Sequence, residues 1–204
     1  MARKYDGSRR AEAARRTREQ IVAAAFRLHG RGILDFETLA QEADVSLATV
    51  RKHFPTRELL FQDCTAYGLH VAPMPNLEEI RQTADPTQRT ELAIRQVFSM
   101  HESLLGQMWV ACQMENESPT MASVLEQYQN LIAQVAAVVL DGWPIADANQ
   151  DLARGQTIAM LSPLTYRALR LQGALSPEQA IFHTAAMLSG SLNSGLSRTE
   201  AAYS

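Results

Sequence analysis

Apolar side chains in the first third of the chain recur with the period of an α-helix. One buried helix face is predicted by residues spaced i, i+3, i+4 and i+7, namely Ile21, Ala24, Ala25 and Leu28. We expect this helix to begin near Arg15. Gly30 and Gly32 should end it, because glycine adopts left-handed conformations at low cost.

Two short helices are predicted next. Asp35 is a candidate N-cap, and it precedes an apolar stripe over two turns: Phe36, Leu39, Ala40 and Ala43. The polar break Asp44-Val45-Ser46 follows, and Ser46 can cap a second short helix over 47–54. Pro55 ends that helix, because proline disfavours helical geometry in the residue before it. A further helix begins near Thr56, and we expect its inward residues to be Leu59, Leu60, Cys64, Tyr67 and Val71.

The clearest boundary in the sequence is the segment 72–76, which contains two prolines two residues apart. Beyond it the pattern predicts helices over 77–82, 87–105, 107–116, 120–141, 148–172 and 177–196. No segment alternates convincingly with the two-residue period of a strand. The sequence therefore predicts an all-α protein.

Composition narrows the class of protein. The chain has 204 residues, of which 46% are hydrophobic and 20% charged, which argues against disordered and fibrous proteins. It contains no apolar run of roughly 20 residues that could span a membrane, and its basic N-terminus lacks the apolar stretch of a signal peptide. Cys64 and Cys112 have no metal-ligand spacing and are interpreted as reduced thiols. These features predict a cytoplasmic protein.

Charge is unevenly distributed along the chain. Residues 1–60 hold 12 Lys and Arg against 8 Asp and Glu, a net charge of +4, whereas residues 61–204 hold 7 against 14, a net charge of −7. Such a division suggests that the first part contacts a polyanion. A chance fluctuation is the alternative.

The two short helices at 35–54 form a helix-turn-helix pattern. Such a motif needs small apolar contacts on its inner side, and Ala40, Val45 and Val50 supply them. The outward side chains of the second helix are small or polar and can approach base edges and phosphates in a major groove: Leu47, Ala48, Thr49, Arg51, Lys52 and His53.

These residues resemble the TetR family of transcriptional regulators. The matching positions are Ile21, Ala24, Ala25, Leu28, Leu39, Ala40, Ala43, Asp44, Val45, Ser46, Thr49, Val50, His53, Phe54, Arg57, Glu58, Leu59 and Leu60. The match covers about 45 residues, and 163–169 is a weaker echo of a stretch in the C-terminal domain of some members. Asp44 and Ala48 replace two family glycines, and Arg51 stands where the family usually has a tyrosine that contacts the phosphate backbone.

The resemblance implies a DNA-binding domain at 15–71 and a ligand-binding and dimerisation domain at 72–204. Residues 1–14 are basic and offer almost nothing to a core, so we expect them to form a flexible arm. The DNA-binding candidates are Thr38, Ser46, Leu47, Ala48, Thr49, Arg51, Lys52, His53 and Arg57, with Arg9, Arg10 and Arg15 as further candidates. The arm is either a solubilising tail or a binder of phosphate or the minor groove.

Assembly and ligand binding follow from the same resemblance. It implies a homodimer that binds a palindromic operator of double-stranded DNA. A small effector would release the dimer from the operator. The helices at 148–172 and 177–196 would pair with those of the second subunit through small residues, including Ala159, Ala168, Ala185, Ala186, Gly190 and Ser194.

The effector is expected to be mostly apolar or aromatic, because the second part is rich in methionine and aromatic residues. The candidate effector-binding residues are His101, Met108, Trp109, Cys112, Gln113, Glu115, Tyr128, Met160 and Tyr166, with Trp109 as the leading candidate. Packing in a helical core is the alternative role for each.

Enzymatic motifs are incomplete. Met100-His101-Glu102 lacks the second histidine of a zinc protease helix, and Gly190 and Gly195 are not followed by the Lys-Ser/Thr of a phosphate-binding loop. We therefore predict neither a catalytic site nor a metal site nor a cofactor. The alternatives to a regulator are a helical interaction module that has lost DNA binding, and a carrier or enzyme for apolar ligands.

Overall fold

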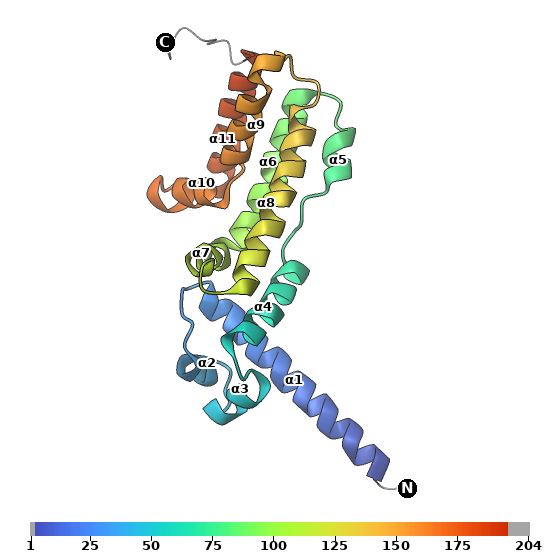
Figure 1. The fold of residues 1–204 in the computed structure, drawn as a ribbon, viewed down its shortest axis with the longest axis vertical. Coiled ribbons are helices and arrows are strands. Elements are labelled where there is room, and N and C mark those ends of the chain that lie inside the picture. The colour runs from blue at the N-terminus through green and yellow to red at the C-terminus, as the bar shows by residue number, and fades with distance from the viewer. Residues whose placement is uncertain (1–2, 196–204) are drawn as a thin grey trace. The chain divides into compact units, whose positions relative to one another are not determined.

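The computed structural model describes the backbone of residues 3–195 and the side chains of residues 7–195 (Figure 1). Over this range the chain is all-α and has no strand, as the sequence predicted. The helices are α1 Arg3–His29, α2 Phe36–Glu42, α3 Leu47–His53, α4 Arg57–Val71, α5 Leu77–Gln82, α6 Pro86–Ser103, α7 Leu105–Met114, α8 Pro119–Leu140, α9 Gln150–Met160, α10 Pro163–Arg167 and α11 Pro177–Asn193. A 3-10 turn, η1 (Asp147–Asn149), precedes α9, and a π-helical turn, η2 (Ala168–Gln172), follows α10.

The N-caps of the two short helices are those that the sequence predicted. The side chain of Asp35 accepts a hydrogen bond from the backbone N–H of Thr38, and that of Ser46 accepts one from Thr49. Each cap satisfies a backbone donor that the first helical turn leaves without an intrahelical partner. The starts of α2 and α3 are therefore encoded locally.

The prediction that the first helix begins near Arg15 is wrong, because α1 extends back to Arg3. Residues 9–14 consist only of arginine, alanine and glutamate, which are strong helix formers. The carboxylate of Glu12 also pairs with Arg15 at 2.8 Å and with Arg16 at 3.2 Å, one helical turn further on. Side-chain pairs at this spacing stabilise an exposed helix.

The single helix predicted over 148–172 is also wrong. α9 ends at Met160, the side chain of Ser162 caps α10, and Pro163 takes the first position of α10. Proline removes a helical hydrogen-bond donor and clashes with the preceding turn, so it separates the two helices. Two shorter helices and the turn η2 replace the long one.

The chain divides into two compact units. The first contains the residues up to Ala72 together with Gly106–Leu125, and the second contains Pro73–Leu105 together with the residues from Glu126 onward. Each unit has its own apolar core. The core of the first unit consists of Ile21, Val22, Ala24, Ala25, Leu28, Leu39, Ala40, Ala43, Val50, Phe54, Leu60 and Cys64.

Helix α4 turns a different face inward from the one expected. Phe61 is buried, whereas Leu59 and Val71, which were predicted to face the core, are 39% and 46% exposed. Leu60 and Cys64 are buried as predicted. Leu59 and Phe61 lie on opposite sides of α4, because two residues span about 200° of a helix, and the core contacts the side of Phe61. Val71 is the last residue of α4.

The segment Gly106–Leu125 packs within the first unit, although the sequence analysis placed it in a domain over 72–204. Gly106 lies so close to Gly30 that an added Cβ would be 1.9 Å from the carbonyl oxygen of Gly30. The side-chain amide of Gln107 donates to the carbonyl of Phe26 at 3.0 Å. These two contacts join the start of α7 to the end of α1. The backbones are so close there that position 106 has no room for a side chain.

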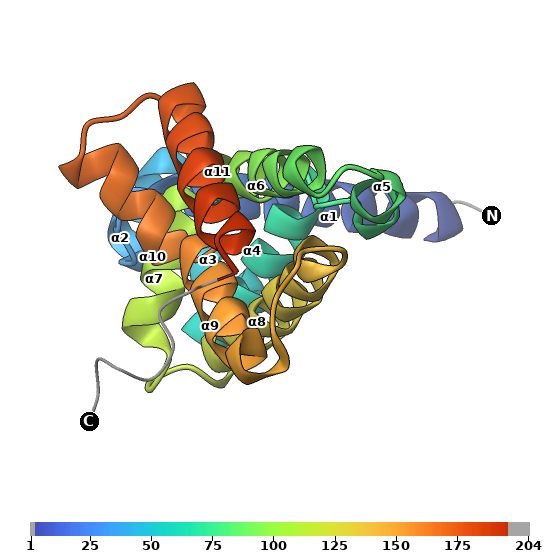
Figure 2. The same ribbon diagram turned by 90° about the horizontal axis from the view of Figure 1, so that it is seen from above.

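The core of the second unit is formed by α6 and α11, which pack against each other, with contributions from α5, α8, α9 and α10 (Figure 2). Its largest fully buried side chains include Phe98, Ile94, Ile132, Tyr166 and Leu188. None of the described helices combines the length and the apolar character that a membrane-spanning segment requires.

Candidate nucleic-acid interface and candidate effector site

Helix α3 presents a polar side and an apolar side. Val50 on α3 and Phe54 directly after it are fully buried in the core that α3 shares with α1, α2 and α4. Arg51 and Lys52 are exposed, and the side chain of Arg51 is 63% accessible. A recognition helix needs such an outer face to enter a groove, so α3 is a candidate for that role.

The turn between α2 and α3 has the geometry that a helix-turn-helix requires. Asp44 has a φ of +49°, a left-handed conformation that aspartate tolerates better than most residues. The backbone N–H of Val45 donates to the carbonyl of Ala40 at 3.0 Å, which closes the turn. The sequence expectation that Asp44 can replace a turn glycine agrees with this conformation.

The remaining DNA-binding candidates lie around the outer face of this motif. Ser46, Ala48 and Arg57 are exposed, and Thr38, Leu47, Thr49 and His53 are half-buried. The hydroxyls of Ser46 and Thr49 lie 2.8 Å apart and hydrogen-bond to each other. Burial lowers the pKa of His53, as do the nearby charges of Arg18 and Lys52, so its imidazole is neutral at pH 7.

Two side chains of α1 hold the C-terminal ends of the short helices. Arg18 donates to the carbonyl of His53 at 2.7 Å and to the carboxylate of Asp63 on α4 at 2.7 Å. Gln20 donates to the carbonyl of Ala43, directly after α2, at 2.7 Å. The final carbonyls of a helix have no intrahelical partner, so these bonds fix where α2 and α3 end. Sequence analysis missed both residues.

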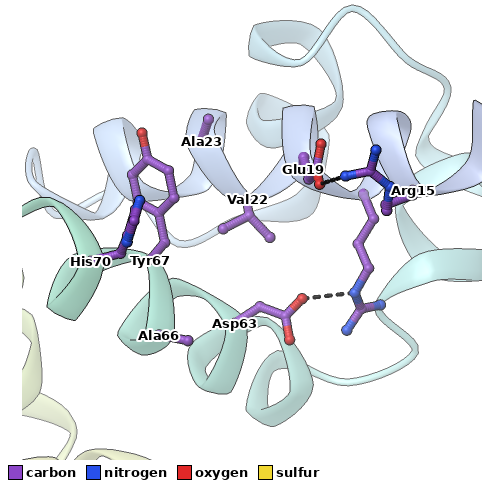
Figure 3. A pocket seen from close by; sticks show the side chains of 9 residues that line it. Arg15, Glu19, Val22, Ala23, Asp63, Ala66, Tyr67 and His70 are labelled. Carbon is purple, nitrogen blue, oxygen red and sulfur yellow. Dashed lines mark hydrogen bonds and ion pairs between the residues drawn. The ribbon is translucent and has the colours of Figure 1, made fainter. Parts of the chain in front are cut away.

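A groove of about 740 Å³ lies between α1 and α4 (Figure 3). Tyr67 and His70 line one end of it, and an ion pair of 2.7 Å between Arg15 and Glu19 lies at the other. Arg15 also pairs with Glu12, so its charge is already engaged by two carboxylates. Arg9 and Arg10 are exposed on the same helix, further toward its N-terminus.

The candidate effector-binding residues fall into two groups. Those on the segment 106–125 belong to the first unit: Met108, Trp109, Cys112, Gln113 and Glu115. Of these, Met108 is buried, Cys112 is half-buried, and Trp109 is 36% exposed. The second group, His101, Tyr128, Met160 and Tyr166, belongs to the second unit. Across the described residues, no group of three His, Cys, Asp or Glu side chains could hold a metal ion.

The second group surrounds a buried histidine. The ring of His101 lies 5.6 Å from that of Tyr128, 5.8 Å from that of Tyr166 and 6.0 Å from that of Phe98. Nε2 of His101 lies 3.0 Å from the carbonyl oxygen of Leu161, the residue after Met160. Burial lowers the pKa of His101 to about 4, so it is neutral at physiological pH.

A charged network borders this aromatic cluster. The hydroxyl of Tyr166 donates to Glu102 at 2.7 Å, and Arg170 donates to both carboxylate oxygens of Glu102, at 2.9 and 3.0 Å. The bonds from Arg170, followed by that from Tyr166, lower the pKa of Glu102. The network ties η2 and α10 to the end of α6.

Exposed apolar side chains gather on two helices of the second unit. Phe182 and Met187 on α11 are 68% and 54% exposed, and Leu152 on α9 is 59% exposed. The neighbouring exposed positions on the two helices carry small residues: Gly155, Ala159, Ala186 and Gly190. Ala185, which the sequence analysis placed on the dimer face, is buried in the core.

Two solved transcriptional regulators have a fold similar to that of this chain. No family model and no curated protein matches the chain. A transcriptional regulator from Rhodococcus sp. Rha1 superposes with a TM-score of 0.66 at 20% identity, over 87% of this chain and 96% of the other. The transcriptional regulator FadR from Bacillus subtilis, in complex with stearoyl-CoA, gives 0.54 at 17%, over 87% and 98%. The chain shares the helical fold of these regulators.

Proposed function

We propose that this protein is a ligand-responsive, homodimeric DNA-binding transcriptional regulator, most simply a repressor released from a palindromic operator. The observation that carries the proposal is α3, a capped helix whose inner residues Val50 and Phe54 are fully buried while Arg51 and Lys52 project outward. The resemblance of this motif to the TetR family and the fold of the two regulators support it.

The exposed apolar face of α9 and α11 supports a dimer. Side chains as large as Phe182 and Leu152 lose favourable burial when left in water, and a second copy of the same face would cover them. Gly155 and Gly190 face open space, and because they have no side chain they would let a second copy of these helices approach closely. A dimer also doubles the base pairs that one recognition helix reads.

The aromatic cluster around His101 is the proposed effector site. Phe98, Tyr128 and Tyr166 offer flat apolar surfaces, and Met160 adds an adaptable one. The Bacillus subtilis regulator of this fold was solved with stearoyl-CoA, a molecule with a long apolar chain, which supports an apolar component in the effector. Trp109 and the other candidates of the first unit stay a prediction.

The segment 106–125 offers a route for regulation inside the DNA-binding unit. Its contacts reach α1 through Gln107 and α4 through Thr120, whose hydroxyl donates to Glu58 at 2.6 Å. Hydrogen bonds from Ser118 and Thr120 lower the pKa of Glu58, so its carboxylate stays ionised and the bonds persist at neutral pH. A displacement of this segment would therefore act on the two helices that support α3.

Selection of DNA sequences by the purified protein tests the function. We expect a palindromic site, bound with an affinity that falls steeply with salt. Lys52→Ala should weaken binding to all sequences and shallow the salt slope by about one unit, because one phosphate contact is lost. Arg51→Ala should cost about 1–3 kcal/mol, and should relax sequence choice if the guanidinium reaches a base.

Arg154→Ala is the matched control, since Arg154 is an exposed arginine on α9 of the other unit. It should leave affinity and salt slope unchanged. Failure to enrich any sequence, or equal operator affinity for Lys52→Ala, Arg51→Ala and the wild type, would contradict DNA binding by α3.

A further inference from the structure

The position of the proton on His101 follows from its neighbour. Nε2 lies 3.0 Å from the carbonyl oxygen of Leu161, and a carbonyl oxygen can only accept a hydrogen bond. A lone pair on Nε2 at this distance would face the lone pairs of the carbonyl, so Nε2 must carry the hydrogen. In the neutral imidazole, Nδ1 is then a bare acceptor.

Nothing among the described residues donates to that acceptor. Nδ1 of His101 has no hydrogen-bond partner, although the side chain is only 1% exposed. The two nearest phenols direct their protons elsewhere. The hydroxyl of Tyr128 donates to Leu161 at 3.2 Å, and that of Tyr166 donates to Glu102 at 2.7 Å. The hydroxyl oxygen of Tyr128 also lies 3.0 Å from Nε2 of His101. Because Nε2 already carries the hydrogen that it donates to the Leu161 carbonyl, this hydroxyl donates to Leu161 and not to His101.

An unpaired acceptor in a core is rare, because burial costs it its hydrogen bond to water. The imidazole that carries it lies within 6.0 Å, centroid to centroid, of three aromatic rings: those of Phe98, Tyr128 and Tyr166. These rings favour a flat, apolar molecule beside the imidazole. An aromatic surface beside one bare acceptor suits a ligand that has an aromatic ring and a hydrogen-bond donor.

We propose that the effector is an aromatic molecule that donates a hydrogen bond from a neutral hydroxyl or N–H group to Nδ1 of His101. This inference rests on the effector site of the proposed function and names the chemistry of its ligand. A donor on the ligand would satisfy the buried acceptor, and its ring would pack against the neighbouring aromatic side chains.

The same geometry argues against an anionic group at this position. A carboxylate has no proton to donate and would place its lone pairs against that of Nδ1. Protonation of His101 would remove this conflict, but burial lowers the pKa of the imidazole to about 4, so the neutral form predominates at pH 7. Arg170, the nearby cation, is already held by Glu102 through two hydrogen bonds. A metal ion is also disfavoured, because the described residues provide no further ligands in a group of three.

Three probes of similar size distinguish these chemistries. Phenol donates a hydrogen bond, anisole has the same ring but no donor, and benzoate is an anion. Their dissociation constants would be measured by calorimetry at pH 7 on the full chain without DNA. We expect phenol to bind at least about tenfold more tightly than anisole, a difference of about 1.4 kcal/mol, and benzoate to bind most weakly. His101→Phe should abolish the preference for phenol, and His70→Phe, a change at an exposed histidine of the other unit, should retain it.

A second measurement does not depend on the folding of a variant. In wild-type protein labelled with 15N-histidine, the Nδ1 signal of His101 should move upfield with phenol and remain in place with anisole. Equal affinities for phenol and anisole, a preference for benzoate, an unmoved signal, or no binding of phenol at millimolar concentrations would each overturn the proposal. Because DNA is absent, these outcomes are independent of whether the protein binds an operator.

Discussion

The guanidinium carbon of Arg18 lies 4.2 Å from the centroid of the Phe54 ring. Phe54 is the fully buried residue that ends α3, and Arg18 also donates to the carbonyl of His53 beside it. A cation above an aromatic face is attracted by the quadrupole of the ring, and the planar guanidinium can stack and donate at the same time. Arg18 therefore connects α1 to the end of the helix that carries Arg51 and Lys52.

Arg18→Ala should destabilise the protein by about 2 kcal/mol, because it removes the ring contact and a charge-assisted hydrogen bond to a backbone carbonyl. Arg18→Lys should recover less than half, since an ammonium cannot stack and bond with the same geometry. Urea unfolding measures both. Arg16→Ala on the same helix is the control, because the Arg16 side chain is 74% exposed and its removal should cost under about 0.5 kcal/mol. If Arg18→Ala were as stable as Arg16→Ala, the anchoring role would be wrong.

The helical extension of α1 makes a separate prediction about DNA. Arg9 and Arg10 lie on a helix that continues to the core of the first unit, so their charges are presented by a rigid element. The double variant Arg9→Ala and Arg10→Ala keeps helix-forming residues while it removes two charges. If both contact phosphates, the salt slope of operator binding should fall by about two units with thermal stability unchanged. An unchanged salt slope would mean that Arg9 and Arg10 do not contact the operator.

Local signals in the sequence were sufficient to predict the helix-turn-helix motif. The caps Asp35 and Ser46 and the left-handed Asp44 act within three or four residues, so their effect can be read without the fold. Pro163 is a local signal as well, and the predicted helix over 148–172 overlooked it.

The interactions that the sequence did not predict join distant positions. Arg18 meets Asp63 and Phe54, and Gly106 meets Gly30, only because helices far apart in the chain pack together. The grouping of His101 with Tyr128 and Tyr166 likewise depends on three separate helices. Composition made these residues candidates, but their geometry depends on tertiary packing.

The exposed face of α11 predicts the effect of a charge on assembly. Phe182→Glu places a carboxylate where the proposed dimer would bury an aromatic ring, and an unpaired buried charge is costly. We expect this variant to sediment as a folded monomer and to bind operator weakly. Gln88→Glu adds the same charge at an exposed position of α6 and should remain dimeric. A wild-type monomer at micromolar concentration, or a dimeric Phe182→Glu variant, would rule out this interface.

Two buried histidines predict how stability depends on pH. Burial lowers the pKa of both His29 and His101 from an ordinary value of 6.5 to about 4. Between these values the unfolded chain binds more protons than the folded one, so protonation favours unfolding. The stability that depends on neutral histidine is complete above about pH 6.5 and is lost as the pH falls toward 4. Each histidine should account for about 2 kcal/mol of that loss between pH 7 and pH 5.

Urea unfolding of the wild type and of His101→Phe at several pH values between 7 and 5 tests this prediction. Removing His101 should reduce the loss of stability over that interval by its own share of about 2 kcal/mol, whatever the variant does to stability at pH 7. His53, whose pKa burial also lowers, titrates in the same direction in both proteins and cancels in the comparison. Glu58 and Glu102 do not contribute to the change in stability between pH 7 and pH 5. Hydrogen bonds hold the pKa of each below its ordinary value of 4.5, so their contribution to stability is lost only at lower pH. A wild-type stability that stays constant from pH 7 to pH 5 would mean that water reaches both imidazoles, and it would also weaken the assignment of Nδ1 of His101 as a bare, buried acceptor.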